Sequence, residues 1–147
     1  MIHFILLVNK LGKLRLNRWY SNEIPHKDRS KVITEITDLV TDRSSTFSNI
    51  IEYSGTLKII YKKYASLFFI FAISTTDNEL LALEALHRYV ELLDSHFGNV
   101  CELDIVFNYE VANYILNEYI LAGEVIDSSR LLSIKDELKL ASQQETD

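Results

Sequence analysis

Cysteine, proline and glycine are scarce in this chain of 147 residues, which has one cysteine, one proline and four glycines. A lone cysteine excludes an internal disulfide, so the fold has to be held together by an apolar core. Apolar residues make up 48% of the sequence, which is enough to close such a core. Few glycines and prolines leave no segment with the composition of a flexible linker. We therefore expect one domain over residues 1–147, with a frayed acidic tail from about 142 to 147.

An excess of positive charge and long apolar runs are also missing. The formal net charge is -6, which argues against a nucleic-acid partner, because such binding needs clustered Lys and Arg to displace counterions. The longest apolar run, at 65–73, has about half of the roughly 20 residues that span a bilayer. The opening residues lack the pattern of a secretory signal. We expect a cytoplasmic protein that neither spans a membrane nor binds nucleic acid.

Five short apolar segments predict β-strands. A continuous run at 4–8 is joined by a turn to an alternating run at 14–19, and β-rich runs follow at 49–53, 57–61 and 64–73. Strands joined by short turns pair antiparallel. A doubly wound parallel sheet is therefore excluded, and one antiparallel sheet is expected.

Helical periodicity predicts four helices. Apolar residues recur every three or four positions at 27–43 and at 78–97, where Asp77 is the candidate N-cap. Two further helices are expected at 109–123 and 127–140. The order β-β-α-β-β-β-α and then two helices predicts an α+β fold, a five-stranded antiparallel sheet flanked by helices, with additional C-terminal helices.

The only cysteine lies in the stretch FGNVCELDIVFN, at 97–108. A nucleophilic thiol needs a base within reach, and the sequence beside Cys101 supplies none. Glu102 and Asp104 lie two apart on a segment that we interpret as extended, with nothing to separate their pKa values. We expect an inert buried thiol, and carboxylates that cap a helix or form ion pairs.

The sequence contains no pattern for a metal, a cofactor or another catalytic centre. The histidines, which show neither HExxH spacing nor a cysteine pair to share a metal, are His3, His26, His87 and His96. The glycines are isolated, and none begins a phosphate-binding loop. A binding domain without catalysis or cofactor is therefore the expected class.

Positive charge gathers in the first hairpin and in one later turn. Strand alternation places Leu14 and Leu16 on one face and Arg15 on the other. The cations are Lys10, Lys13, Arg15 and Arg18, with Lys62 and Lys63 later in the chain. This pattern is typical either of a solvated edge or of a local positive spot that binds an acidic peptide or an anionic headgroup.

Three blocks, GKLRLNRWY at 12–20, YKKYASLFF at 61–69 and FGNVCELDIVFN at 97–108, occur together. With them the chain resembles the small (sigma) subunit of a clathrin adaptor complex, from residue 1 to about 129. The longin-like fold of that family agrees with the order of elements expected from periodicity. Within the family, ALHRYVELLD at 85–94 favours the trans-Golgi and endosomal type, whereas LAGE at 121–124 and the opening MIHFIL are similar to the plasma-membrane type.

The resemblance implies a subunit of a cytosolic heterotetramer that gathers membrane cargo into coated vesicles. The small chain would pack against a large adaptin, and a second large chain and a medium chain would complete the complex. Clathrin would bind indirectly, and membranes peripherally through the complex. The locations implied are Golgi and endosomal membranes or, alternatively, plasma-membrane coated pits. The alternative interpretations are a coatomer-like small subunit and a longin-type regulatory domain.

The resemblance also implies a binding site for acidic dileucine signals, formed jointly with the large chain. These signals have Glu or Asp, three further residues, then Leu and Leu or Ile. The residues implied for the leucine site are Tyr64, Ala65, Leu67, Val90, Asn99, Val100 and Leu103. Arg15 matches the basic residue that faces the signal's acid, together with an arginine of the large chain.

Overall fold

The computed structural model describes residues 1–42 and 48–125. Their centre is one antiparallel sheet with the strand order β2-β1-β5-β4-β3. Its strands are β1 (Ile2–Asn9), β2 (Leu14–Trp19), β3 (Ile50–Glu52), β4 (Leu57–Tyr64) and β5 (Leu67–Ser74). The predicted α+β class and five-stranded antiparallel sheet are confirmed.

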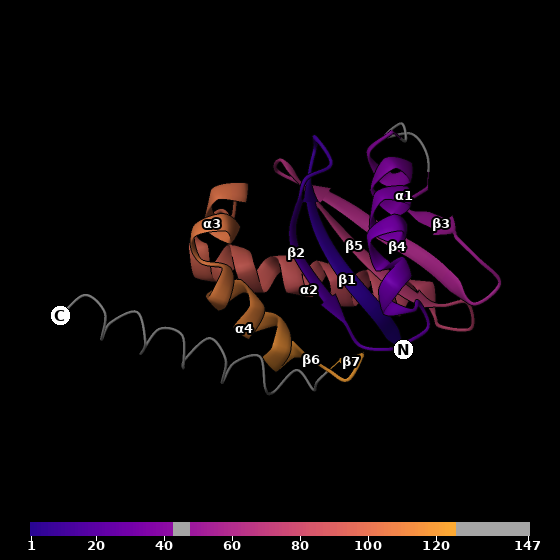
Figure 1. Cartoon of the computed structure of the whole chain (residues 1–147). Helices are drawn as coiled ribbons and strands as arrows, with labels where there is room; N and C mark the ends of the chain where they lie inside the picture. Colours follow the sequence, from indigo (N-terminus) through magenta and orange to yellow (C-terminus); the bar gives the residue numbers. More distant parts are fainter. Residues whose placement is uncertain (43–47, 126–147) are drawn as a thin grey trace.

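Helices cover both faces of the sheet (Figure 1). One face carries α1 (Arg29–Thr41), which follows the short 3-10 turn η1 (His26–Asp28). The other face carries α2 (Glu79–Phe97), α3 (Glu102–Phe107) and α4 (Tyr109–Tyr119), and the small hairpin of β6 (Ile120–Leu121) and β7 (Glu124–Val125) follows α4. The sheet is therefore the middle layer of three.

Two apolar cores lie on the two faces, because side chains alternate along each strand. On β1, Ile5 and Leu7 belong to the core under α2 and α4. Phe4 and Leu6 belong to the core under α1, which includes Ile36. Strands covered on both faces need apolar residues at nearly every position, which explains the continuous apolar run that begins the chain.

A β-bulge interrupts the pairing of β1 with β2. Leu7 pairs with Leu16 and Val8 pairs with Leu14, so Arg15 is an extra residue on β2. As a result, Leu16 joins the core under α2, whereas Leu14 packs against the core under α1. The prediction that both leucines share a face is wrong, because simple alternation does not foresee an inserted residue.

The boundaries of α2 and α3 differ from the sequence prediction. The N-cap of α2 is Asn78 rather than Asp77, since the Asn78 side chain accepts hydrogen bonds from the backbone of Leu80 and Leu81. The segment after Cys101, interpreted as extended, is the short helix α3.

The helix predicted over 109–123 is shorter than expected, because α4 ends at Tyr119. The next residue, Ile120, is extended, with φ -122° and ψ 117°. Gly123 has φ +85°, and a β-carbon there would lie 2.5 Å from the Ile2 carbonyl oxygen, so the β6–β7 turn requires glycine. The predicted helix at 127–140 and the tail from about 142 lie outside the described residues.

Candidate functional site

Three segments that are distant in sequence meet at one end of the sheet, around the Asp94 carboxylate at the end of α2. Asp94 Oδ1 accepts a hydrogen bond from the Tyr64 hydroxyl, at 2.8 Å, and one from the Val100 backbone N–H, at 2.9 Å. The bond to the Asp94 carboxylate raises the pKa of Tyr64. Asp94 thereby fixes the β4–β5 turn and the α2–α3 loop against each other.

The apolar residues predicted for the leucine site divide into buried and exposed groups. Leu67, Val90 and Val100 are 0%, 2% and 2% exposed and belong to one core, against which Tyr64 packs. Leu103 is 62% exposed on α3, and Ala65 is exposed in the β4–β5 turn. The structure therefore gives the site a buried apolar floor and exposed apolar groups on the turn and on α3.

Two residues of the site adopt the left-handed backbone conformation. Ala65 has φ 54° and Asn99 has φ 68°. Within the described residues, only one other non-glycine residue, Ala122, has positive φ. Such conformations are uncommon outside glycine, persist only where surrounding contacts enforce them, and cluster at binding sites. Both residues are exposed, but each adjoins a residue that is hydrogen-bonded to Asp94, Tyr64 beside Ala65 and Val100 beside Asn99.

The predicted cation, Arg15, is already paired within the chain. Its Nε and Nη2 atoms each lie 2.7 Å from Oε1 of Glu102, the first residue of α3. Both side chains are 23% exposed. The bulge makes this contact possible, because regular alternation would turn Arg15 toward the α1 face, opposite Leu16.

A second donor holds the Glu102 carboxylate. Asn9 Nδ2 donates to Glu102 Oε1 at 2.9 Å, while Asn9 Oδ1 accepts from the backbone of Leu11 and Lys13. Hydrogen bonds from Asn9 and from Arg15 lower the pKa of Glu102, because they favour its charged form. The β1–β2 turn and α3 are therefore joined by a charged network.

The remaining groups of this stretch have structural roles. Asp104 Oδ2 accepts from the Cys101 backbone N–H at 3.0 Å, which caps α3. The predicted roles of these two acids are confirmed, since Asp104 caps a helix and Glu102 forms an ion pair. Their segment is helical rather than extended. Cys101 is half-buried rather than fully buried. Across residues 1–42 and 48–125, no three His, Cys, Asp or Glu side chains gather as metal ligands would.

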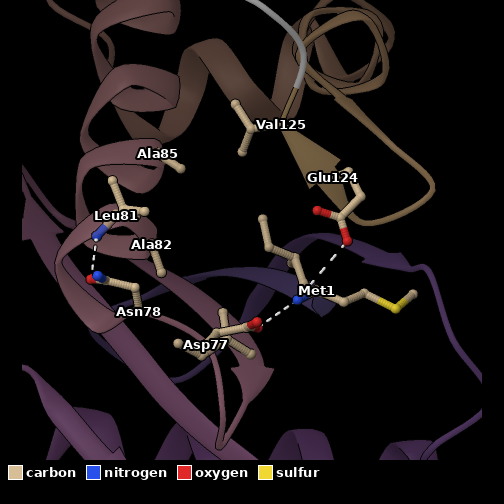
Figure 2. A pocket seen from close by; sticks show the side chains of 10 residues that line it. Met1, Asp77, Asn78, Leu81, Ala82, Ala85, Glu124 and Val125 are labelled. Carbon is tan, nitrogen blue, oxygen red and sulfur yellow. Dashed lines mark hydrogen bonds and ion pairs between the residues drawn. The ribbon is translucent and has the colours of Figure 1, made fainter.

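A separate pocket of about 200 Å³ lies at the opposite end of the sheet, between the start of α2 and the β6–β7 hairpin (Figure 2). Its charged groups are already paired, since the Met1 amino group lies 2.5 Å from Asp77 Oδ2 and 4.0 Å from Glu124 Oε1. The predicted site residues do not line this pocket. None of the helices in the described part of the chain is long and apolar enough to cross a bilayer.

Sequence reasoning missed two residues that organise the site. Asp94 is one of several acids on α2, and its partners lie 30 residues before it and 6 residues after it. Asn9 looks like an ordinary turn residue, and its partner Glu102 is 93 positions away. Neither residue stands in a local motif, so only the folded chain shows what they contact.

Comparison with known proteins identifies the family. The family model described as "Clathrin adaptor complex small chain" matches residues 1–144. The chain belongs to this family. Adaptor small chains are subunits of complexes that act in vesicle trafficking, and they are not enzymes. The family supports the adaptor interpretation over the coatomer-like and longin-type alternatives.

Individual adaptor proteins match nearly the whole chain. The chain is 51% identical over 135 residues to AP-1 complex subunit sigma-3 of Homo sapiens, covering 92% of this chain and 86% of that protein. It is 47% identical over 150 residues to AP-1 complex subunit sigma-1 of Arabidopsis thaliana, covering 99% and 92%. A chain of the structure titled "Homology model of the full-length AP-3 complex in a stretched open conformation" matches with a TM-score of 0.72 and 26% identity, covering 99% and 98%.

Proposed function

We propose that this adaptor small chain binds acidic dileucine sorting signals jointly with a large adaptin. The observation that carries the proposal is the convergence around Asp94. There the β4–β5 turn, through Tyr64, and the α2–α3 loop, through Val100, meet over a buried apolar floor. Glu102, two residues after Val100, brings the Arg15 cation to the same loop. The chain thus joins an apolar site for leucines to a cation for the signal's acid.

The apolar part of the site dominates the binding energy. Burying one leucine side chain is worth about 1.5 to 3 kcal/mol. A partly exposed ion pair is worth about 1 kcal/mol or less. Ordering a peptide tail opposes both terms. Capture by one such site is therefore weak, and retention at a membrane depends on several contacts made by the whole complex.

Binding also requires a local rearrangement. A ligand cannot contact side chains such as Leu67, Val90 and Val100 while they are at most 2% exposed. Tyr64 and Phe97 are partly buried and pack against the same core, so they are the groups that would move aside. Assembly with the large chain, or the peptide itself, would open this floor.

We place the chain in an AP-1-type heterotetramer with two large chains and a medium chain. The support is the similarity to AP-1 sigma subunits from animals and plants. The expected location is the cytosolic face of trans-Golgi and endosomal membranes and of coated vesicles. Purifying the endogenous complex and identifying its large chains tests this assignment, which plasma-membrane adaptins or coatomer chains would contradict.

The test of the peptide site is a binding titration with the reconstituted complex and a fluorescent acidic dileucine peptide. Arg15→Glu reverses the cation, and Ala65→Asp adds a charge to an exposed left-handed position in the turn. Each should weaken binding about tenfold or more. The glutamate placed at position 15 repels the acid of the signal, and a negative charge at position 65 would have to lose water beside the signal's leucines. Normal binding by both variants would refute the proposal.

Two controls make the result specific. Ala122→Asp has the same chemistry at another exposed alanine with positive φ, φ 51°, in the β6–β7 turn outside the site. It should bind the dileucine peptide normally. A tyrosine-based cargo peptide should bind all variants equally, which shows that the complex is intact. Substitution of Val100 is unsuitable, because that side chain is in the core.

A further inference from the structure

The carboxylate of Glu102 already occupies the cation that the proposed ligand needs. Oε1 of Glu102 receives three donors, Arg15 Nε and Nη2 at 2.7 Å each and Asn9 Nδ2 at 2.9 Å. An Arg–carboxylate contact of this length is a charge-assisted hydrogen bond. The free chain therefore presents Arg15 with its charge largely compensated.

The geometry leaves only part of the guanidinium available. An arginine has five N–H donors in a fixed fork, and Glu102 takes the Nε–Nη2 edge. A ligand carboxylate has to approach the Nη1 end beside the Glu102 charge, or it has to displace Glu102. In the first case two carboxylates share one cation at short distance, and in the second Glu102 loses its own ion pair, so each case costs binding energy.

Glu102 is also held in place, so it does not easily turn away. Asn9, which donates to it, is 6% exposed and is itself fixed by the backbone of Leu11 and Lys13. Glu102 begins α3 directly after Cys101, whose backbone N–H is capped by Asp104. Both sides of the contact thus rest on ordered backbone.

We propose that Glu102 is a specificity-determining residue of the peptide site, an internal carboxylate that competes with the acid of the sorting signal for Arg15. It lowers the preference of the site for acidic signals below what Arg15 alone would give. The inference rests on the proposed function of Arg15. It goes beyond that function because it makes Glu102, an acid of the small chain itself, the residue that sets how strongly the site prefers acidic signals.

The experiment is Glu102→Gln in the reconstituted complex, titrated with two peptides. One peptide carries Glu at the acidic position of the dileucine signal, and the other carries Gln there. Glutamine keeps an oxygen for the Asn9 and Arg15 donors but removes the charge. The affinity for the Glu peptide should rise roughly three- to fivefold, the size of a partly exposed ion pair, and the affinity for the Gln peptide should stay the same.

The control for overall charge is Glu110→Gln, which removes an exposed acid at the start of α4. It should leave the ratio of the two affinities unchanged. Glu102→Ala is the second variant, and it should also raise the ratio. In an Arg15→Gln background, Glu102→Gln should have no effect on the ratio, because the competition requires the cation.

The outcomes separate this inference from the proposed function. If the wild-type complex binds neither peptide, the proposed function fails. If the wild type prefers the Glu peptide but Glu102→Gln leaves the ratio unchanged or lowers it, competition by Glu102 is refuted, while the peptide site stands. A rise of the ratio in both Glu102 variants, lost in the Arg15→Gln background, supports the competition.

Discussion

The helices on the two faces of the sheet contact it in different ways. Under α1, the interior contains apolar groups such as Ile36, and the bond from the Tyr53 hydroxyl to Glu35 on α1 lies at the surface. Under α2 and α4, polar groups act inside the protein, as in the buried bond from the Tyr89 hydroxyl to the Ala112 carbonyl. Hydrogen bonds are directional, so the buried ones fix the orientation of the elements that they join. The candidate site lies on the face that has these buried hydrogen bonds.

The largest expected effect comes from breaking the core under α1. Ile36→Ala removes a fully buried side chain and should lower the free energy of unfolding by about 2 to 5 kcal/mol. Urea denaturation of the purified chain measures this loss. The affinity of the folded complex for the dileucine peptide should not change. A change in peptide selectivity would contradict the separation of the two faces.

A smaller loss, with a functional effect, is expected for Asp94→Ala. This variant leaves the Val100 N–H and the Tyr64 hydroxyl without their acceptor, which should cost about 1 to 3 kcal/mol of unfolding free energy. Peptide affinity should fall, and the Val100 amide should exchange faster with deuterium. Glu91→Ala, one turn earlier on α2 in an exposed pair with His87, is the matched control. Equal effects of the two variants would argue against a special role of Asp94.

Tyrosine hydroxyls compare the two faces directly. Tyr119→Phe removes a buried hydrogen bond to the Ala85 carbonyl and should cost about 0.5 to 1.5 kcal/mol, the net contribution of one such bond. Tyr53→Phe removes an exposed bond to Glu35 on the α1 side and should cost less, since water replaces the hydroxyl. Thermal or urea unfolding gives both values. The reverse order would show that the faces do not differ in this way.

The smallest effect is the pH dependence of the Glu102 contact. Because the pKa of Glu102 is lowered in the folded chain, its stabilisation is fully present above the unfolded value of 4.5 and is lost as the pH falls through the folded pKa. The difference in unfolding free energy between wild type and Glu102→Gln should therefore be constant near pH 7 and shrink in acid. Urea titrations at several pH values measure it. A difference that grows in acid would contradict the ion pair.

The sequence predicts the sheet well, because its signals are local. Continuous apolar runs mark β1 and β5, which are covered on both faces. Helical spacing likewise identifies α1 and α2. The predicted element boundaries are wrong where the fold overrides a local pattern. Periodicity predicts a helix that continues to Gly123, but the backbone at Ile120 is extended and ends it. The α3 segment is too short for periodicity to distinguish a helix from a strand.

For the candidate site, family resemblance supplied what local patterns could not. It named Tyr64 and Val100, which the structure brings to one carboxylate. It also named Arg15, but it did not foresee the partner Glu102, which is 87 positions away. Contacts over such separations leave no periodic signal, so the pairing emerges only from the three-dimensional arrangement. Peptide binding itself stays a prediction.

The bulge on β2 makes the cation depend on chain length as well as on residue identity. Deleting Arg15 would leave Leu14 and Leu16 adjacent and still opposite Val8 and Leu7, so the strand would pair regularly and both leucines would keep their faces. An arginine in a regularly paired strand, next to Leu16, would instead face α1 and would lose its contact with Glu102. The length of the first hairpin therefore determines which side of the sheet this cation faces.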